Sequence, residues 1–257
     1  MRAPDELKAI VEEYLEELEL WPELHGQAVS VRNAFVEMGG KRIRPVICLA
    51  TGEAVGAEPE QVLPAAAALE LVHNFSLVHD DLPSLDDDTE RRGKPSVWAA
   101  YGEGKAVLAG DALLAEAFRL ASSYASSAVA RELAEATLGM IGGQYLDTME
   151  PKTDLTTVHR LKTGRLFYAS VTLALAAAEV PDSAQRPWRA FAEELGMLFQ
   201  VVDDILDGDG FVVTLGVDGA RRLADDAAAR ARAALEQVGA DTSVLAGIVD
   251  DLAVRTA

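Results

Sequence analysis

The chain has 257 residues, and its 23 lysines and arginines against 42 aspartates and glutamates give a formal net charge of −19. Apolar residues make up 49% of the sequence, which is enough to build a core and excludes an intrinsically disordered chain. A surface this negative argues against nucleic acid as a partner, because a phosphate backbone would be repelled.

The setting of the protein is indicated by its cysteine content and its hydropathy. A single cysteine, Cys48, excludes a disulfide scaffold and fits a reducing compartment. The longest uncharged run has 13 residues, at 166–178, whereas a bilayer span needs about 20. The N-terminus carries no apolar secretion segment. We therefore expect a cytoplasmic protein with no membrane span.

Helical periodicity dominates the chain from end to end. Apolar residues recur at three- and four-residue spacing in segments rich in alanine, leucine and glutamate, at 5–20, 61–82, 110–125, 131–149 and 158–180. No stretch alternates with a period of two, as a half-buried strand would, and no linker or long repeat divides the sequence. The sequence predicts an all-α, single-domain helical bundle over residues 1–257.

Some of these helices are apolar on more than one face. Residues 161–178 are apolar around most of the helix, which is typical of the centre of a bundle or of a subunit contact. Residues 110–121 and 131–143 present more apolar surface than a lone domain of this length could cover. We therefore expect a homodimer.

A first aspartate cluster follows the second of these helices, with the sequence HDDLPSLDDD at 79–88. Pro83 is expected to end the helix near Asp81, so that Asp86 lies on a loop that turns back past the helix end. Asp80 and Asp81 are opposed there by the helix dipole, and no lysine or arginine follows before Arg91. The alternative interpretation of these aspartates is a solvent-exposed acidic loop with no functional role.

A second aspartate cluster lies within an apolar helix, with the sequence FQVVDDILD at 199–207. Asp203 and Asp207 are one turn apart on the same helix face, with Asp204 beside them. A salt-bridged core aspartate would explain one such residue but not three, because buried carboxylates without partners are destabilising. Two facing groups of carboxylates, with no cysteine or histidine spacing for zinc, favour Mg²⁺.

Three basic motifs stand out from the acidic average: GGKRIRP at 39–45, RRGKP at 91–95 and KTGR at 162–165. Each alone is ordinary for a protein surface. In combination with two acidic clusters they predict a site for more than one diphosphate group. The Gly-rich nucleotide-binding signatures are absent.

In this order and spacing, the motifs resemble those of the trans-prenyltransferase (polyprenyl diphosphate synthase) family. The resemblance covers about residues 32–207 and includes ELVH at 70–73, GD at 110–111 and GGQ at 142–144. It implies an isoprenoid synthase-like bundle with a central cavity. It also implies a Mg²⁺-dependent condensation of isopentenyl diphosphate with an allylic diphosphate, in which departing pyrophosphate leaves an allylic cation.

The resemblance also implies the roles of particular residues. The residues expected to bind isopentenyl diphosphate are Lys41, Arg44, His73 and Arg92. Those expected to hold the allylic diphosphate are Arg91, Lys162, Thr163 and Gln200. Three Mg²⁺ ions per site are expected to be held by Asp80, Asp81, Asp86, Asp203, Asp204 and Asp207, of which the last three aspartates bind partly through water. The residues expected to be catalytic are Asp80, Asp81, Asp86, Asp203, Asp204 and Lys162.

The chain departs from the family pattern after the second aspartate cluster. Members of the family usually carry a lysine-containing segment there, but here Gly208 leads within ten residues to a helix near Asp218, and no lysine follows Lys162. Either this is a shortened variant or residues are missing from the sequence. A true deletion would leave the allylic diphosphate with one fewer cation.

Two other functions compete with this interpretation. A class I terpene cyclase would need a different second metal motif and would have no use for Lys41 and Arg44. A non-catalytic subunit of a prenyl synthase should have lost one aspartate cluster, and both are present. Only the absent lysine segment favours this second alternative.

Product length is expected to depend on the helix that carries the first cluster. Phe75 and Ser76 lie five and four residues before Asp80, and five residues span about 7.5 Å of helix. An aromatic residue at this depth would block a growing chain, as in short-chain synthases. We expect farnesyl diphosphate as the product, with geranylgeranyl diphosphate as the alternative.

Overall fold

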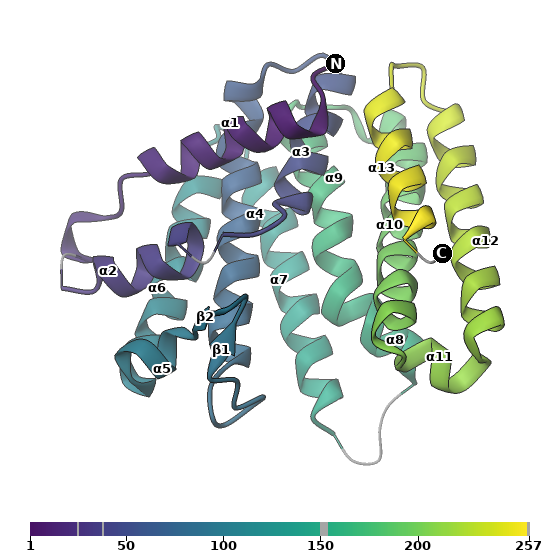
Figure 1. The fold of residues 1–257 in the computed structure, drawn as a ribbon. Coiled ribbons are helices and arrows are strands. Elements are labelled where there is room, and N and C mark those ends of the chain that lie inside the picture. Colours follow the sequence, from purple (N-terminus) through teal and green to yellow (C-terminus); the bar gives the residue numbers. More distant parts are fainter. Residues whose placement is uncertain (25, 38, 150–153, 256–257) are drawn as a thin grey trace.

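Long helices form most of the computed structural model, which describes residues 1–24, 26–37, 39–149 and 154–255 (Figure 1). The first half of the chain forms α1 (Pro4–Glu17), a 3-10 turn (Pro22–Leu24), α2 (Ala28–Arg32), a π-helical turn (Asn33–Glu37), α3 (Ile43–Ala54), α4 (Pro59–Asp80), β1 (Glu90–Arg91), β2 (Lys94–Pro95) and α5 (Val97–Tyr101). The rest forms α6 (Glu103–Ala121), α7 (Ala128–Asp147), α8 (Leu155–His159), a π-helical turn (Arg160–Gly164), α9 (Arg165–Ala177), α10 (Asp182–Asp207), α11 (Gly210–Leu215), α12 (Val217–Glu236) and α13 (Ser243–Val254). The predicted all-α class is confirmed.

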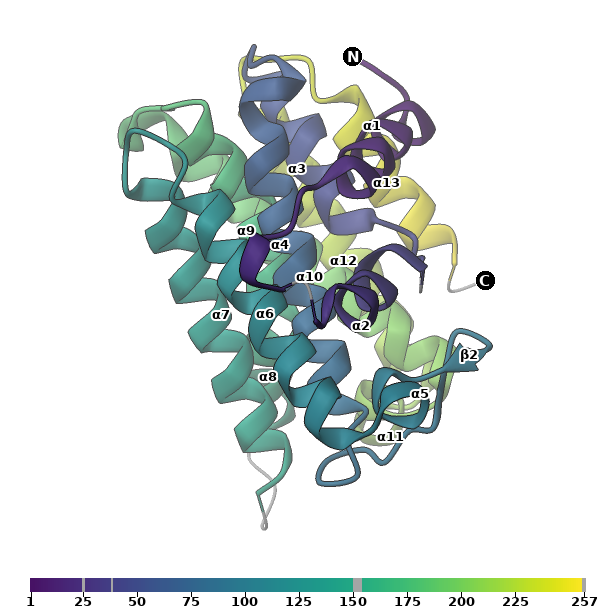
Figure 2. The ribbon, with the colours of Figure 1, turned by 90° about the vertical axis from the view of Figure 1, so that its left-hand side faces the viewer.

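The core of the bundle is built around α4 and α9. α4 packs against α3, α6 and α9, and α9 packs in turn against α7 and α10. The side chains of Ala65 to Leu69 are at most 1% exposed, because four successive alanines let neighbouring helices approach α4 closely. α1 crosses the upper end of the bundle (Figure 1), and the view turned by 90° shows α7 beside α6 (Figure 2).

Among the described residues, α4 is the one helix that is long and apolar enough to cross a membrane by length and composition. In this structure 67% of its most apolar window is buried inside the bundle. The central helix of a water-soluble fold passes the same test.

α4 ends as its sequence predicts. Its last helical residue is Asp80, three residues before Pro83, whose ring disfavours a helical conformation in the residue before it. The backbone N–H of Asp86 then donates to the Asp80 carbonyl oxygen at 2.9 Å. The loop therefore returns past the helix end and brings the basic segment 91–95 back toward α4.

Two local features differ from the sequence expectation. Residues 90–95 form a short antiparallel hairpin, with Arg91 opposite Lys94, where no strand was predicted because two-residue strands are too short for alternation to show. The segment 158–180, predicted as one helix, is divided into α8, a π-helical turn and α9. At this turn the backbone packs so closely on α7 that a Cβ atom on Gly143 would lie 2.2 Å from the Lys162 nitrogen.

The connection after the second aspartate cluster is as short in the structure as in the sequence. α10 ends at Asp207 and is followed by Gly208, whose φ of +74° lies in the left-handed region that favours glycine. α11 begins two residues later and packs against α10 and α12. The lower end of α10 is therefore covered by α11.

Candidate active site

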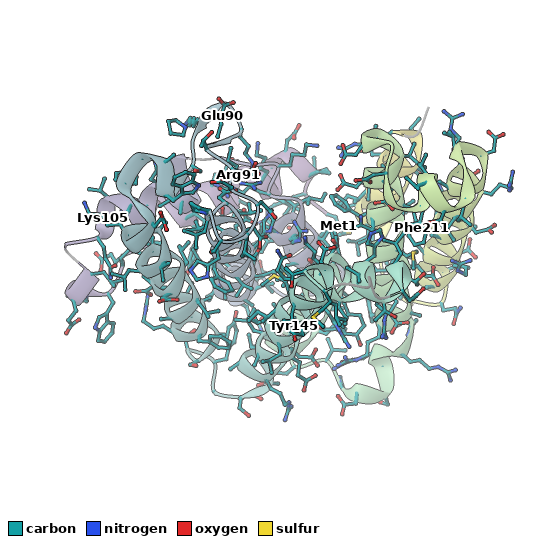
Figure 3. All side chains as sticks on the ribbon, turned by 90° about the horizontal axis from the view of Figure 1, so that it is seen from below. Met1, Glu90, Arg91, Lys105, Tyr145 and Phe211 are labelled. Atoms are coloured by element: carbon teal, nitrogen blue, oxygen red, sulfur yellow. The ribbon has the colours of Figure 1, made fainter. Side chains whose placement is uncertain are left out.

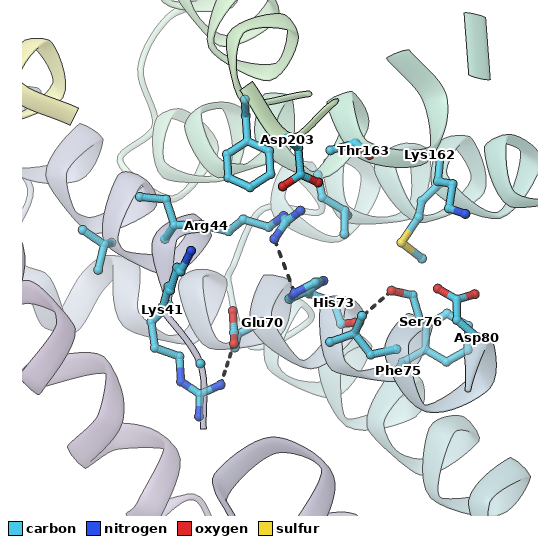
Figure 4. Close-up of a pocket in the computed structure, with 18 of the residues that line it drawn as sticks. Lys41, Arg44, Glu70, His73, Phe75, Ser76, Asp80, Lys162, Thr163 and Asp203 are labelled. Carbon is cyan, nitrogen blue, oxygen red and sulfur yellow. Dashed lines mark hydrogen bonds and ion pairs between the residues drawn. The ribbon is translucent and has the colours of Figure 1, made fainter. Parts of the chain in front are cut away.

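A cavity of about 1130 Å³ opens in the bundle between α3, α4, α7, α10 and α13 (Figure 4). Most of the site residues predicted from the sequence line it, namely Lys41, Arg44, His73, Phe75, Ser76, Asp80, Arg91, Arg92, Lys162, Thr163 and Asp203. Five others lie outside its lining, namely Asp81, Asp86, Gln200, Asp204 and Asp207. Segments that are far apart in the sequence thus contribute to one site.

One side of this cavity is cationic; we call Lys41, Arg44, His73 and Arg92 the cation cradle. Lys41 lies two residues before α3, Arg44 lies in the first turn of α3, and Arg92 comes from the hairpin. The Arg92 guanidinium donates to the carbonyl oxygen of Gly39, and a Cβ atom on Gly40 would lie 2.8 Å from Arg92 Nη1. Gly39 and Gly40 both have positive φ, at +61° and +149°, so this turn favours glycine and brings the Arg92 side chain against the backbone before α3.

Arg44 is held against apolar neighbours, which leaves part of its guanidinium without a partner. The guanidinium lies 4.5 Å from the centre of the Phe167 ring, and burial lowers the pKa of Arg44 to about 10. The buried Nε of Arg44 has no hydrogen-bond partner among the described residues. A buried donor of this kind suits an anion with several oxygens.

His73 is neutral in this environment. Burial lowers its pKa well below the usual value, and the surrounding arginines, first among them Arg44, act in the same direction. Arg44 Nη1 lies 3.4 Å from His73 Nε2. Since a guanidinium can only donate, Nε2 is the acceptor and Nδ1 carries the proton that is available to a ligand.

Glu70 is a carboxylate in the wall of the cavity beside these cations, one turn before His73 on α4. It forms an ion pair with Arg42, with 2.6 Å between Arg42 Nη1 and Glu70 Oε1. Neither Arg42 nor Glu70 was assigned a role from the sequence. The available signal was a single glutamate within the apolar stretch of α4, which requires a cationic partner when buried.

Two carboxylates also line the cavity: Asp203 on α10 lies beside the Arg44 guanidinium, and Asp80 on α4 lies further along, toward Lys162 (Figure 4). Burial raises the pKa of Asp80 to about 6, although the Lys162 ammonium nearby acts in the opposite direction. Burial also raises the pKa of Asp203, and the carboxylates of Asp207 and Asp204 add to the effect. Both groups therefore lack full charge compensation from the protein.

The second aspartate of each pair is turned away from the cavity. Asp81 is 2% exposed and accepts hydrogen bonds from Arg91 Nε at 2.7 and 3.0 Å. Asp204 is 3% exposed and accepts from Gln200 Nε2 at 2.7 Å and from the Phe211 backbone N–H at 2.8 Å. The expected platform of six carboxylates is thus reduced to Asp80 and Asp203 at the cavity surface, with Asp86 and Asp207 exposed outside its lining.

Lys162 and Thr163 are placed in the cavity by the π-helical turn between α8 and α9. Lys162 Nζ forms an ion pair with Asp147 Oδ2 at 2.7 Å, a partner on α7 that the sequence analysis did not identify. Insertions of this kind within a helix often occur at functional sites. Here the turn places Lys162 across the cavity from Asp80 (Figure 4).

Phe75 lines the cavity on the same helix as Asp80, as predicted (Figure 4). Its ring makes an edge-to-face contact with His79, with 4.9 Å between ring centres. His79 Nε2 lies 3.1 Å from the Val107 carbonyl oxygen of α6. The ring of Phe75 is therefore supported from behind by α6.

Seen from below, the labelled residues mark three sides of the molecule (Figure 3). Arg91 lies on the hairpin side, Phe211 on the side of α10 to α12, and Tyr145 on α7. Arg91 and Tyr145 both line the cavity, so the hairpin and α7 form two of its borders.

The chain is similar to proteins of one family over most of its length. The sequence pattern described as "Polyprenyl synthetase" matches residues 28–219. A geranylgeranyl diphosphate synthase of Cyanophora paradoxa is 41% identical over 66% of this chain and 61% of that protein. A farnesyl diphosphate synthase of Escherichia coli is 38% identical over 85% of this chain and 86% of that protein.

A solved structure supports the same assignment. A geranyltransferase from Legionella pneumophila superposes with a TM-score of 0.87 at 30% identity and covers 98% of this chain and 96% of its own. The motifs, the bundle and the cavity with its basic and acidic side chains agree with these similarities. This chain belongs to the polyprenyl synthetase family.

Proposed function

We propose that this protein catalyses the head-to-tail condensation of isopentenyl diphosphate with an allylic diphosphate to give a short-chain prenyl diphosphate. The observation that carries the proposal is one cavity lined both by the cation cradle and by the carboxylates of Asp80 and Asp203. Two diphosphate groups held in two chemically different ways are what this reaction requires.

The cation cradle is the proposed site for isopentenyl diphosphate. The partnerless Nε of Arg44 and the proton on His73 Nδ1 are donors for its oxygens. Lys162 and Thr163, together with Arg91, are the proposed contacts of the allylic diphosphate. Gln200, expected in the same role, donates instead to Asp204.

Magnesium is the metal that the donor set fits. Carboxylate oxygens with raised pKa values face the cavity, and no group of three or more potential ligand side chains converges within the described residues. Mg²⁺ suits such an open arrangement, because it keeps water ligands and shares phosphate oxygens with a substrate. Asp80 and Asp203 would hold it, and it would supply positive charge for a departing pyrophosphate.

The protein's own groups perform the remaining tasks. Lys162 and Arg91 offset negative charge that develops on the departing pyrophosphate. Phe75, Leu166 and Phe199 line the cavity with apolar surface and exclude water from an allylic cation. The released pyrophosphate is the proposed base for the final proton, so no protein side chain is required in that role.

Farnesyl diphosphate is the proposed product. Phe75 stands at a moderate depth below the proposed metal site, and its ring is supported by His79. Geranylgeranyl diphosphate is the alternative, because a tilt of one ring would admit a further five-carbon unit. Relatives with either activity in their names are similar to this chain, so the names do not favour one product.

A cytoplasmic homodimer is the proposed form of the protein. Outside the cavity lining, α6 exposes Val107 and Leu108, and α7 exposes Leu138, at 39%, 56% and 70%. Apolar side chains gathered on two neighbouring helices are typical of a subunit contact. Light scattering at micromolar concentration tests this, and a monomeric mass would contradict it.

A steady-state assay tests the proposed function against the two alternatives. The protein is supplied with isopentenyl diphosphate, dimethylallyl diphosphate and Mg²⁺, and the products are separated by chromatography. We expect linear prenyl diphosphates. Cyclic hydrocarbons formed without isopentenyl diphosphate would indicate a terpene cyclase, and the absence of any product would favour a non-catalytic subunit.

A further inference from the structure

We propose that the buried ion pair between Arg42 and Glu70 positions Lys41 and Arg44 for the diphosphate of isopentenyl diphosphate. This inference rests on the proposed function, because it assigns a positioning pair to the same cation cradle. Arg42 and Glu70 are therefore positioning residues, and neither is expected to contact the substrate.

The contacts of this pair leave little freedom to either side chain. The two side chains are 3% and 4% exposed, and Arg42 Nη1 lies 2.6 Å from Glu70 Oε1. Asn74, one turn further along α4, donates to the Glu70 carbonyl oxygen at 2.7 Å and to its carboxylate at 3.3 Å. α4 thus holds the carboxylate in place, and the carboxylate holds Arg42.

The backbone at Arg42 shows what this contact does. Arg42 immediately precedes α3 with φ 51° and ψ 29°, in the left-handed region that residues other than glycine seldom adopt. Such a conformation persists only where surrounding contacts determine it. The ion pair binds the Arg42 side chain to Glu70 of α4, in the wall of the cavity that Lys41 and Arg44 also line. The guanidinium of Arg42 is thus neutralised within the wall, whereas Lys41 and Arg44 on either side of it remain for a ligand.

The charge of Glu70 also acts on the rest of the cradle. Its carboxylate favours the charged forms of Arg44 and Arg92, whereas Arg92 disfavours the charged form of Arg44. Glu70 therefore offsets repulsion between guanidinium groups that must lie close together to bind one diphosphate.

Two single substitutions distinguish a positioning role of the pair from a purely electrostatic effect of its charges. If Glu70 acted only as a negative charge near an anion, Glu70→Gln would tighten diphosphate binding and Arg42→Gln would weaken it. If the pair positions the cradle, both substitutions weaken binding, by about tenfold or more, because the cations lose their fixed arrangement. The double variant Arg42→Gln/Glu70→Gln should lie closer to the wild type than the two losses combined, because no buried charge is left unpaired.

The measurements are calorimetric titration with inorganic pyrophosphate and the two KM values in turnover. We expect KM for isopentenyl diphosphate to rise while KM for the allylic substrate and kcat change little. If the pair only stabilised the fold, both substitutions would lower the thermal unfolding temperature, and the two KM values would change by the same factor. The matched control is Glu116→Gln, since Glu116 is 2% exposed, is paired with Arg119 and lies outside the cavity lining.

The outcomes distinguish this inference from the proposed function. A wild-type protein that forms no prenyl product would contradict the proposed function, while the pyrophosphate titration would still report on the cradle. Tighter binding by Glu70→Gln, or losses as large in Glu116→Gln, would overturn the positioning role. Unchanged affinity in both single variants would overturn it as well.

Discussion

The two aspartate clusters have the same internal arrangement but are stabilised differently. In each, the first aspartate of a neighbouring pair lines the cavity and the second is almost fully buried elsewhere. Asp81 is bound by the side chain of Arg91, whereas Asp204 is bound by the backbone N–H of Phe211 and by Gln200. Adjacent residues on a helix point about 100° apart, so one pair can serve both a cavity and an anchor.

This difference indicates what each cluster stabilises. The Asp81–Arg91 pair ties the end of α4 to the hairpin that also carries Arg92. The Asp204 carboxylate ties the end of α10 to the start of α11, and a Cβ atom on Gly210 would lie only 2.1 Å from Asp204 Oδ2. Asp204 thus anchors the short connection between α10 and α11.

The largest expected effect is loss of the aspartates that line the cavity. Asp80→Ala and Asp203→Ala should each lower turnover by about 10³ or more, because each removes a charge preorganised for the proposed metal and pyrophosphate. Turnover at saturating Mg²⁺ measures this, with Asp225→Ala on the exposed face of α12 as the control. An Asp203→Ala enzyme within tenfold of the wild type would mean that the second cluster is structural throughout.

The second aspartate of the pair should behave differently. Asp204→Ala leaves the buried Phe211 N–H without its acceptor, so the free energy of unfolding should fall by about 1–3 kcal/mol. Urea denaturation measures this, and Asp207→Ala, which removes an exposed carboxylate, should leave stability almost unchanged. Full stability of Asp204→Ala together with a 10³-fold loss of turnover would make Asp204 a ligand rather than an anchor.

The two clusters also differ in the aromatic residue that precedes them. Phe75 lies before Asp80 in the proposed chain tunnel, whereas Phe199 lies before Asp203 and packs on Phe167 near Arg44. Phe75→Ala should lengthen the products by one or more isoprene units, as read by product chromatography. Phe199→Ala should change substrate affinity without changing product length, and an unaltered distribution in Phe75→Ala would place the stop elsewhere.

The smallest expected effect is a pH-dependent gain in stability. The pKa of Asp80 is raised by burial from 3.8 to about 6, so its charge destabilises the folded protein above pH 6 and has no such effect below about pH 4. Asp80→Asn should therefore have a higher Tm than the wild type at pH 8 in EDTA. The expected rise is about 2–4 °C for each kcal/mol of destabilisation that the substitution removes. Thermal melts at pH 4 and pH 8 measure this. An equal difference at both values would exclude ionisation of Asp80 as its cause.

Local sequence signals predicted the larger part of this fold. Apolar spacing placed α1, α4, α6 and α7 to within a few residues, except that α6 begins at Glu103, earlier than its apolar pattern. Pro83 predicted the end of α4 and the returning loop. These features follow from side-chain periodicity and from backbone restrictions that act within a few residues.

The sequence by itself also determined which polar and charged groups are available, since the motifs at 39–45, 70–73, 79–95, 162–165 and 199–207 contain every proposed diphosphate and metal ligand. Only the tertiary structure decided which of them face the cavity. That Asp80 and Asp203 line it while Asp81 and Asp204 do not depends on how α4 and α10 are rotated in the bundle. That Arg42 meets Glu70 depends on the packing of α3 against α4. Both are set by contacts between residues distant in sequence, and no periodicity within one helix encodes them.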